Sequence, residues 1–457
     1  MTARSYCVVG GGISGLTAAY RLRVAAGDDA VITLLDPAPR LGGILRTEPV
    51  GGVPMDLGAE AFVLRRPELP ALLSELNLTG RQRVSTGARP LIYSRGRLHP
   101  LPTGTVVGIP SSAASMAGLV DNATLARIDA EPRQPLHWRP GSDPAVADLV
   151  GDRFGEQVVS RSVDPLLSGV YAGSAATIGL RAAAPTVAAA LDRGAASLTD
   201  AVRRALPPAT GAPVFGALDG GYRVLVDELV ARALPRRVRA AAARLEPAGP
   251  GWAVVDDAGA RRHADAVILA VPAREVARLL AGIAPRSAAA AGRVVAASSV
   301  VLALAAPGDT AFPDCSGVLV ATGERLRAKA ITLSSKKWGT RADVQLLRLS
   351  FGRFGDQVAA RTPDEELRGW ALADLAAVFG LDVRPVDVRV QRWLDAMPQY
   401  GPGHAELVGE LRAGLPPTLA VARATWTASG CPPAWARPGA RSRPFRRKWH
   451  DRSHGQA

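Results

Sequence analysis

Cysteine and histidine are scarce in this chain: its 457 residues include three cysteines and six histidines. Cys7, Cys315 and Cys431 lie far apart and form no Cys-x-x-Cys pair, which excludes both a disulfide framework and a zinc site of the usual spacing. The histidines show no His-x-x-His spacing, so we expect no bound metal. Unpaired cysteines are typical of a protein that works in the reducing cytoplasm.

Long apolar runs are also missing. The longest, residues 294–306, has 13 residues, whereas a helix needs roughly 20 to cross a bilayer. Its valine, serine and leucine content predicts a buried strand instead. The N-terminus runs directly into a strand and a glycine turn, so no signal peptide is expected. We therefore predict a cytoplasmic protein. Peripheral contact with a membrane surface, through apolar helices within residues 90–205, stays open.

The positive charge is not gathered into a stripe. The formal net charge is +14, and the last 31 residues hold seven basic residues against Asp451, so this tail alone supplies +6. The remaining charge is spread over 426 residues. A nucleic-acid-binding domain normally concentrates lysine and arginine on one face. We therefore expect no nucleic-acid partner, while an anionic small substrate is compatible with the charge.

The first 36 residues contain a complete pattern for binding a dinucleotide. Residues 6–9 predict a short buried strand, residues 13–25 a helix, and residues 31–35 a second strand that ends at Asp36. The turn between the first strand and the helix consists of Gly10, Gly11, Gly12, Ile13, Ser14 and Gly15.

Each part of this pattern has a physical role. Gly10 permits the tight turn, Gly12 lets the backbone approach a pyrophosphate, and Gly15 lets the helix pack closely on the strand. The helix N-terminus offers N–H groups and a partial positive charge to the phosphates. Asp36 is placed to accept hydrogen bonds from the adenosine ribose, and its charge disfavours a 2′-phosphate. The sequence therefore predicts FAD or NAD rather than NADP.

Two following segments favour FAD over NAD, because they resemble FAD-contact segments of the amine-oxidase-like flavoproteins. They are residues 40–43, Arg-Leu-Gly-Gly, and residues 55–60, Met-Asp-Leu-Gly-Ala-Glu. Their glycines would let backbone lie against the pyrophosphate or the flavin. We therefore predict that FAD is the cofactor, with further contacts from Arg40, Gly42, Gly43, Leu57, Gly58, Ala59 and Glu60.

Four more segments resemble signatures of the protoporphyrinogen and coproporphyrinogen oxidases. They are residues 161–173, which contain PLLSGVYAG, residues 215–225, residues 266–273, and residues 393–404, which contain AMPQY. The resemblance extends from residue 1 to about residue 426. It is closer to the Gram-positive and actinobacterial branch, whose members oxidise coproporphyrinogen III.

This resemblance implies an α/β fold: a Rossmann-type FAD-binding domain like that of the amine oxidases, a sheet-containing substrate domain and a helical insertion. The implied FAD-binding domain is discontinuous and comprises residues 1–82, 210–290 and 395–426. The helical module is expected at 90–205, with its helices interrupted by a loop at 169–173. The substrate-binding domain is expected at 290–395, with part of 50–90.

The resemblance also implies a reaction, the six-electron oxidation of coproporphyrinogen III to coproporphyrin III in haem biosynthesis. Hydride would pass to flavin N5 and then to molecular oxygen, so no side chain is expected to act as the catalytic group. Val238 is implied as a backbone contact to the adenine, Arg89 as a partner of a substrate propionate, and Gly169 as part of a loop over the substrate. We interpret Lys336 and Lys337 as the solvated end of a strand.

Several alternatives stay open. The substrate could be protoporphyrinogen IX, which differs from coproporphyrinogen III at two ring substituents. The chain could instead be another flavoenzyme of the superfamily, such as an amine oxidase or a carotenoid-type desaturase, or an FAD-binding product without activity. Other enzymes of the haem pathway are further candidate partners.

The resemblance stops after Trp426. The family continues with a segment like DGVGVPACIGSG and a last helix whose N-terminus faces the flavin, whereas residues 427–457 are rich in proline and arginine. One inserted G after the Trp426 codon allows the reading DGVGVPACVGAAGRAVAAVSEEVAR. We hypothesise that residues 427–457 are a frameshifted tail. Loss of the helix would weaken FAD binding and impair the activity of the chain as written.

Overall fold

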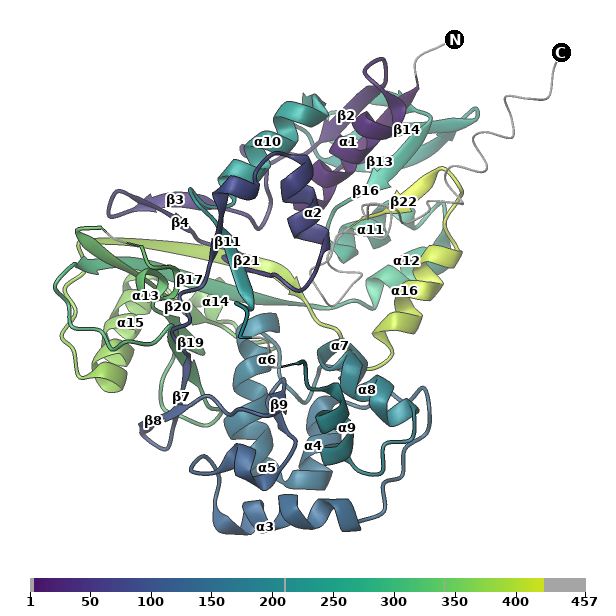
Figure 1. Ribbon diagram of the computed structural model, residues 1–457. Helices are drawn as coiled ribbons and strands as arrows, with labels where there is room; N and C mark the ends of the chain where they lie inside the picture. Colours follow the sequence, from purple (N-terminus) through teal and green to yellow (C-terminus); the bar gives the residue numbers. More distant parts are fainter. Residues whose placement is uncertain (1–3, 209–210, 341, 423–457) are drawn as a thin grey trace.

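A parallel sheet of five strands carries the glycine turn on its central strand (Figure 1). The structure, a computed structural model, describes residues 4–208, 211–340 and 342–422; the tail at 427–457 lies outside the described residues. Helix α1 (Ile13–Ala26) follows the first strand, so the predicted strand–helix–strand unit is confirmed. In spatial order the strands are β12 (Arg236–Val238), β2 (Val31–Leu35), β1 (Ser5–Val9), β16 (Ala266–Leu269) and β22 (Leu419–Val421).

Both faces of this sheet are covered, because successive residues of a strand point to opposite sides. Val8 and Ile32 pack with one set of elements, whereas Cys7 and Val267 pack with the other. The first face is covered by α1 and α10 (Arg223–Ala233). The second is covered by α11 (Ala273–Leu280), α12 (Pro285–Gly292), α16 (His404–Ala413) and an antiparallel sheet of β13 (Ala242–Ala248), β14 (Gly251–Asp256) and β15 (Arg261–Ala264).

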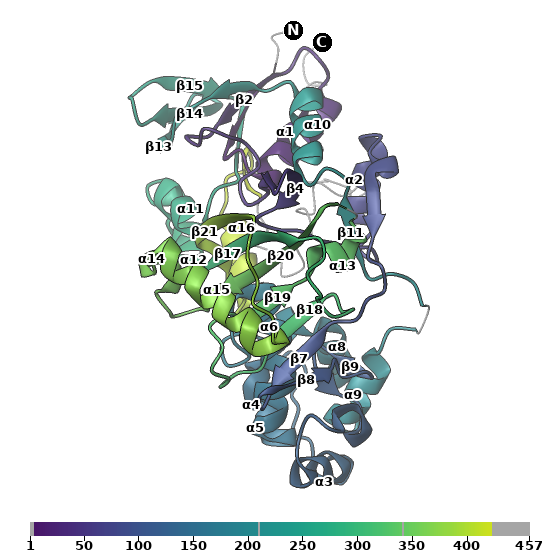
Figure 2. The ribbon, with the colours of Figure 1, turned by 90° about the vertical axis from the view of Figure 1, so that its left-hand side faces the viewer.

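A second, seven-stranded sheet forms the part of the molecule at the left of Figure 1. The run 294–306 forms its long strand β17, and the predicted buried strand is confirmed. The strand order is β21 (Asp387–Pro398), β17 (Ala296–Pro307), β20 (Val344–Phe351), β19 (Ala330–Thr332), β18 (Gly317–Val320), β7 (Leu91–Ser94) and β8 (Arg97–Pro100). Helix α15 (Asp364–Phe379) packs on one face, which Figure 2 shows from the side.

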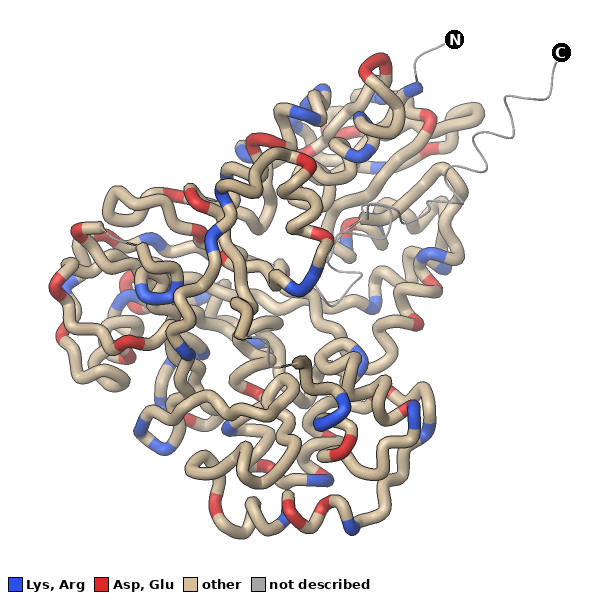
Figure 3. The backbone as a smooth tube through the Cα atoms, viewed as in Figure 1, with Lys and Arg blue, Asp and Glu red and all other residues tan. Residues whose placement is uncertain are grey.

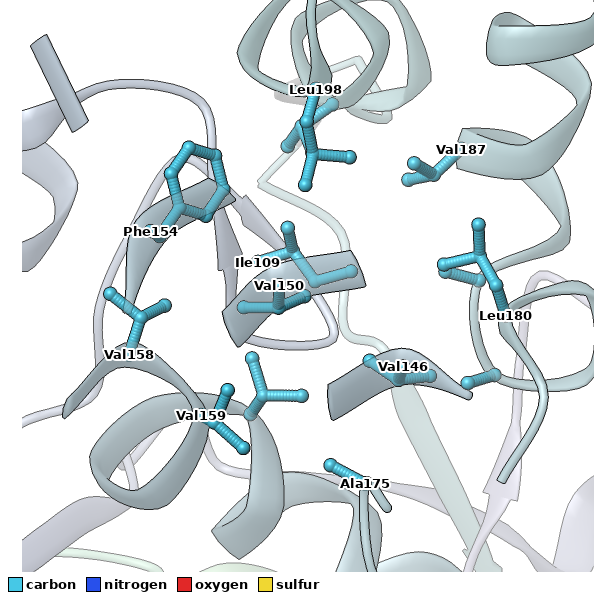
Figure 4. Packing of buried hydrophobic residues seen from close by; sticks show 14 of the residues in the cluster. Ile109, Val146, Val150, Phe154, Val158, Val159, Ala175, Leu180, Val187 and Leu198 are labelled. Atoms are coloured by element: carbon cyan, nitrogen blue, oxygen red, sulfur yellow. The ribbon is translucent and has the colours of Figure 1, made fainter. Parts of the chain in front are cut away.

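The third part is a helical module below the two sheets in Figure 1. Its hydrophobic core includes Phe154, Val150 and Leu198, which are fully buried (Figure 4). The helices are α3 (Asn122–Ala130), α4 (Val146–Phe154), α5 (Glu156–Val158), the π-helical turn η4 (Val159–Val163), α6 (Asp164–Tyr171), α7 (Leu180–Ala183), α8 (Pro185–Asp192) and α9 (Leu198–Ala205).

The structure also contains shorter elements. They are β3 (Thr47–Val50), β4 (Val53–Asp56), β5 (Phe62–Val63), α2 (Glu68–Glu75), η1 (Thr79–Arg81), β6 (Gln82–Val84), β9 (Thr105–Val106), β10 (Ile109–Pro110), η2 (Ala113–Met116), η3 (Glu131–Arg133), β11 (Phe215–Leu218), α13 (Ser334–Trp338) and α14 (Val358–Arg361).

Two local predictions are wrong. The loop expected at 169–173 begins only at Ala172, because residues 169–171 complete α6 and Ala172, at φ 51°, ends that helix in the left-handed region. Lys336 and Lys337 belong to the short helix α13 rather than to a strand end. The Lys337 amine lies 3.6 Å from the carboxylate of Glu60, a partner that lies too far away in sequence for any local pattern to indicate.

Figure 3 shows Lys and Arg positions interspersed along the described backbone with Asp and Glu positions in all three parts. Within the described ranges, every helix is too short or too polar to cross a membrane.

One lysine is buried in the seven-stranded sheet. Lys329 is 4% exposed, and its amine donates hydrogen bonds to Ser299 Oγ, at 2.9 Å, and to the carbonyl of Gly352. Burial, and then the charge of Arg353, lower the pKa of Lys329 to about 7, against the opposing effect of Asp356. Two acceptors match the two N–H donors of a neutral amine, so the folded protein favours the uncharged form.

We predict that Lys329 makes folding stability depend on pH. Between about pH 7 and pH 10.5 the amine is protonated in the unfolded chain but not in the folded one, so stability rises with pH, by up to ~1.4 kcal/mol per unit. The variant Lys329→Met has no amine at this position, so this rise of stability with pH should be absent. Unfolding of both proteins by urea at several pH values tests the prediction, and parallel stability curves for the two would contradict it.

Candidate active site

A cavity of about 1030 Å³ lies at the carboxyl ends of the parallel strands. Open α/β sheets bind ligands at this edge, because the loops that follow the strands leave a crevice there. On the sheet side the cavity is lined by Val9, Gly10, Leu35, Asp36, Ala270 and Val271. On the far side it is lined by Val170 and Tyr171 from α6 and by Met397 and Tyr400 at the end of β21.

The glycine turn forms the floor of this cavity. Gly10 has φ +106°, and a Cβ there would lie 2.5 Å from the carbonyl oxygen of Ala270. A Cβ at Gly15 would lie 1.8 Å from the carbonyl oxygen of Gly10, so helix and turn can pack this closely only around glycine. Gly12 differs, because a Cβ there would meet nothing closer than the Cα of Gly43, at 3.7 Å. Gly12, Ile13 and Ser14 line the cavity, where a pyrophosphate could meet the start of α1.

Asp36 also lines the cavity, at the end of β2. Its two carboxylate oxygens accept hydrogen bonds from the backbone N–H groups of Gly11, at 2.5 Å, and Ala38, at 2.8 Å. Each oxygen keeps a lone pair that could accept from a ribose hydroxyl. Val238 does not line the cavity; its carbonyl accepts from the Asp36 N–H at 3.0 Å and so joins β12 to the end of β2.

The segment 40–45 is fastened by Arg40. Its guanidinium donates to the carbonyls of Gly43, at 2.7 Å, and Leu45, at 2.8 Å. Burial lowers the pKa of Arg40, with the charge of Arg46 acting in the same direction. Arg40 therefore supports the segment and does not line the cavity, whereas Gly43 does; Gly42 donates to the carbonyl of Gly11 at 2.8 Å.

Of the predicted FAD contacts in residues 57–60, only Ala59 lines the cavity. Leu57 is buried, and Gly58 is packed so tightly that a Cβ would lie 1.9 Å from the carbonyl oxygen of Ile44. The carboxylate of Glu60 instead accepts from the Trp338 indole N–H at 2.6 Å.

The two residues predicted to contact substrate lie outside the cavity. Arg89 is exposed, in the segment before β7. Gly169 is also exposed, and a Cβ there would lie 3.2 Å from Leu319. Its neighbours Val170 and Tyr171 are the residues of α6 that line the cavity.

The far end of the cavity contains two tyrosines from the signature segments 161–173 and 393–404, neither of which was predicted as a site residue. The rings of Tyr171 and Tyr400 meet edge to face at 5.7 Å between centroids. Arg66, Arg181 and Arg278 also line the cavity.

These three arginines differ in their partners. Arg181 forms an ion pair with Asp192 at 2.8 Å, and Arg278 with Glu275 at 2.9 Å. For Arg66 no such pair is formed with any acid among the described residues. In the sequence it follows the predicted FAD-contact segment 55–60 after the five residues 61–65. Among those same residues, no group of three His, Cys, Asp or Glu side chains could hold a metal ion.

Comparison with known protein families gives a match along nearly the whole chain. The model of the flavin-containing amine oxidoreductases matches residues 13–430. The coproporphyrinogen III oxidase of Mycobacterium tuberculosis (strain ATCC 25618 / H37Rv) is 72% identical over 94% of this chain and 95% of its own length. The coproporphyrinogen III oxidase of Mycobacterium leprae is 69% identical over 94% of this chain and 96% of its own length. That of Bacillus subtilis is 26% identical over 89% of this chain and 90% of its own length.

Solved structures show the same architecture. The crystal structure of a protein from Exiguobacterium sp. 255-15, described as a protoporphyrinogen oxidase, superposes with a TM-score of 0.85 at 25% identity and covers 98% of this chain and 100% of its own. A putrescine oxidase superposes with a TM-score of 0.66 at 17% identity over 99% of both chains, which shows the fold alone.

The glycine turn allows a matched test of the floor of the cavity. Gly12→Ala adds a methyl group that meets no protein atom closer than 3.7 Å, so we predict an unchanged Tm but at least tenfold weaker FAD binding. Gly15→Ala places its Cβ 1.8 Å from the carbonyl oxygen of Gly10, which should destabilise the fold by about 1–3 kcal/mol. Thermal unfolding and FAD titration of both variants separate the two effects. Equal losses of stability in Gly12→Ala and Gly15→Ala would contradict the assignment of Gly12 to FAD binding and of Gly15 to helix packing.

Proposed function

The chain belongs to the flavin-containing amine oxidoreductases and, within them, to the coproporphyrinogen III oxidases, and from this membership we propose that it catalyses the FAD-dependent oxidation of coproporphyrinogen III to coproporphyrin III. The observation that carries the proposal is the 72% identity to the mycobacterial enzymes over 94% of the chain. The reaction belongs to haem biosynthesis and removes six electrons and six hydrogens from the substrate.

The residues at the floor of the cavity fit FAD. The open space above Gly12 and the start of α1 suit the pyrophosphate, and Asp36 suits the adenosine ribose. We propose direct contacts from the predicted residues that line the cavity: Gly10, Gly12, Ile13, Ser14, Asp36, Gly43 and Ala59. For the others we propose supporting roles in the turn and in segments 40–43 and 57–60: Gly11, Gly15, Arg40, Gly42, Leu57, Gly58, Glu60 and Val238. Bound FAD would supply a hydride acceptor at N5, reoxidised by molecular oxygen.

The far wall of the cavity suits an apolar macrocycle. Tyr171, Tyr400 and Met397 offer ring faces and a thioether, which exclude water from the reacting carbon. Burial raises the pKa of Tyr171, so its hydroxyl stays protonated at neutral pH. Arg66 lines the same cavity, and a guanidinium matches the geometry of a propionate carboxylate. We therefore propose Arg66 as the substrate cation, in place of Arg89, which does not line the cavity.

We predict that Arg66→Met raises KM for coproporphyrinogen III about tenfold, because one charge-assisted hydrogen bond is worth about 1.5 kcal/mol or more. FAD affinity should not change. The neighbouring Arg65→Met is the control, since Arg65 is exposed and does not line the cavity. Steady-state kinetics measure both. A normal KM in Arg66→Met together with a raised KM in Arg89→Met would return the role to Arg89.

Protoporphyrinogen IX is the second candidate substrate, supported by the Exiguobacterium structure with a TM-score of 0.85. The two substrates differ in the number of carboxylates, four in coproporphyrinogen III and two in protoporphyrinogen IX. Comparison of kcat/KM for the two distinguishes them, and a higher value for protoporphyrinogen IX would overturn the first assignment.

The hypothesis of a frameshifted tail at residues 427–457 can be tested together with the function. We predict fluorescent coproporphyrin formation by a protein with the restored reading frame, and weaker FAD binding and slower turnover by the chain as written. Equal turnover of the two would make the tail dispensable. No turnover by either, with FAD bound, would contradict the proposed substrate.

Location in the cytoplasm, with or without contact at a membrane surface or with other haem-pathway enzymes, belongs to this proposal, and cell fractionation tests it.

A further inference from the structure

Segment 56–60, between β4 and β5, is held by side chains of the seven-stranded sheet. Three consecutive carbonyls of the segment accept hydrogen bonds from that sheet. The Arg348 guanidinium on β20 donates to the carbonyls of Asp56, at 2.9 Å, and Gly58, at 3.0 Å. The Trp393 indole on β21 donates to the carbonyl of Leu57 at 2.9 Å. These three carbonyls therefore depend for their hydrogen bonds on residues about three hundred positions away in sequence.

The Glu60 side chain is bound in the same way. Besides Trp338, its carboxylate accepts from Ser334 Oγ at 3.1 Å, and the cations of Lys337 and Arg348 each lie 3.6 Å away. Burial alone would raise the pKa of Glu60, but these cations and hydrogen bonds outweigh it and lower the pKa to about 2. Glu60 is therefore ionised, and its charge anchors the end of the segment to α13 and β20.

Segment 56–60 cannot shift without breaking its contacts with these partners. The Arg348 side chain is 13% exposed, so its removal would leave two carbonyls without a donor in a place where water has little access. Gly58 lies between the carbonyl of Ile44 and the ring of Trp393, at 1.9 and 3.0 Å from the position of a Cβ. Ala59 and Ala61, on either side of Glu60, line the cavity. A shift of the segment would therefore move the cavity wall.

We propose that Arg348 is a positioning residue that sets segment 56–60 at the flavin, and so links the substrate-binding sheet to the cofactor. The proposal rests on the proposed binding of FAD in this cavity. Arg348 acts through the segment and does not itself line the cavity. Its Nη1 donates to both carbonyls while its Nε lies 3.6 Å from the Glu60 carboxylate, so one guanidinium serves two places that a lysine amine cannot occupy at once.

The test uses the full chain as Arg348→Met and Arg348→Lys, with Arg384→Met as control because the Arg384 side chain is 88% exposed. The first readout is amide hydrogen exchange of the FAD-free protein. We expect at least tenfold faster exchange at residues 57–61 in Arg348→Met, with no change in α1. The second readout is the FAD Kd and the visible spectrum of the bound flavin. We expect a Kd raised at least tenfold, a shifted absorbance maximum, and partial recovery in Arg348→Lys.

Unchanged exchange at residues 57–61 overturns the proposal, and so does fast exchange with a normal FAD Kd and spectrum. Neither measurement uses a porphyrinogen, so failure of the proposed substrate would show separately, as bound FAD without turnover. If Arg348→Met does not fold, Trp393→Phe removes the donor to the Leu57 carbonyl instead. Wild-type exchange and Kd in both Trp393→Phe and Arg348→Lys would then overturn the proposal.

Discussion

The cavity depends on the close approach of Gly15 to Gly10. With only 1.8 Å between the Gly10 carbonyl oxygen and the position of a Cβ on Gly15, α1 starts directly over the end of β1. The N–H groups of its first turn therefore face the same space as Asp36 at the end of the neighbouring strand. A single methyl group at this point would separate helix and strand, and the phosphate and ribose subsites would lose their spacing.

The opposite wall comes from parts of the chain that meet only in the tertiary structure. Helix α6 supplies Tyr171, and the end of β21 supplies Tyr400, from the helical module and the second sheet. Arg348 and Trp393 tie segment 56–60 to that sheet. The cofactor floor and the substrate wall are thus joined by side-chain hydrogen bonds rather than by a continuous sheet.

The sequence predicted the dinucleotide unit well, because its chemistry is local: strand, glycine turn, helix and terminal acid lie within 36 residues. The buried strand β17 was equally predictable from its apolar run. Contacts between residues far apart in the sequence could not be predicted. The partnership of Lys337 with Glu60 and the place of Arg66 in the cavity follow from packing between distant segments. The loop expected at 169–173 was wrong for another reason: α6 continues through Gly169 to Tyr171 and ends only at the left-handed Ala172.

We propose that this cavity passes electrons from a porphyrinogen to FAD. The most direct measurement mixes the FAD-loaded protein with coproporphyrinogen III without oxygen and follows flavin absorbance near 450 nm. The account predicts bleaching of the flavin with coproporphyrinogen III and none with putrescine. A flavin that stays oxidised with coproporphyrinogen III, or that bleaches only with the amine, would contradict it.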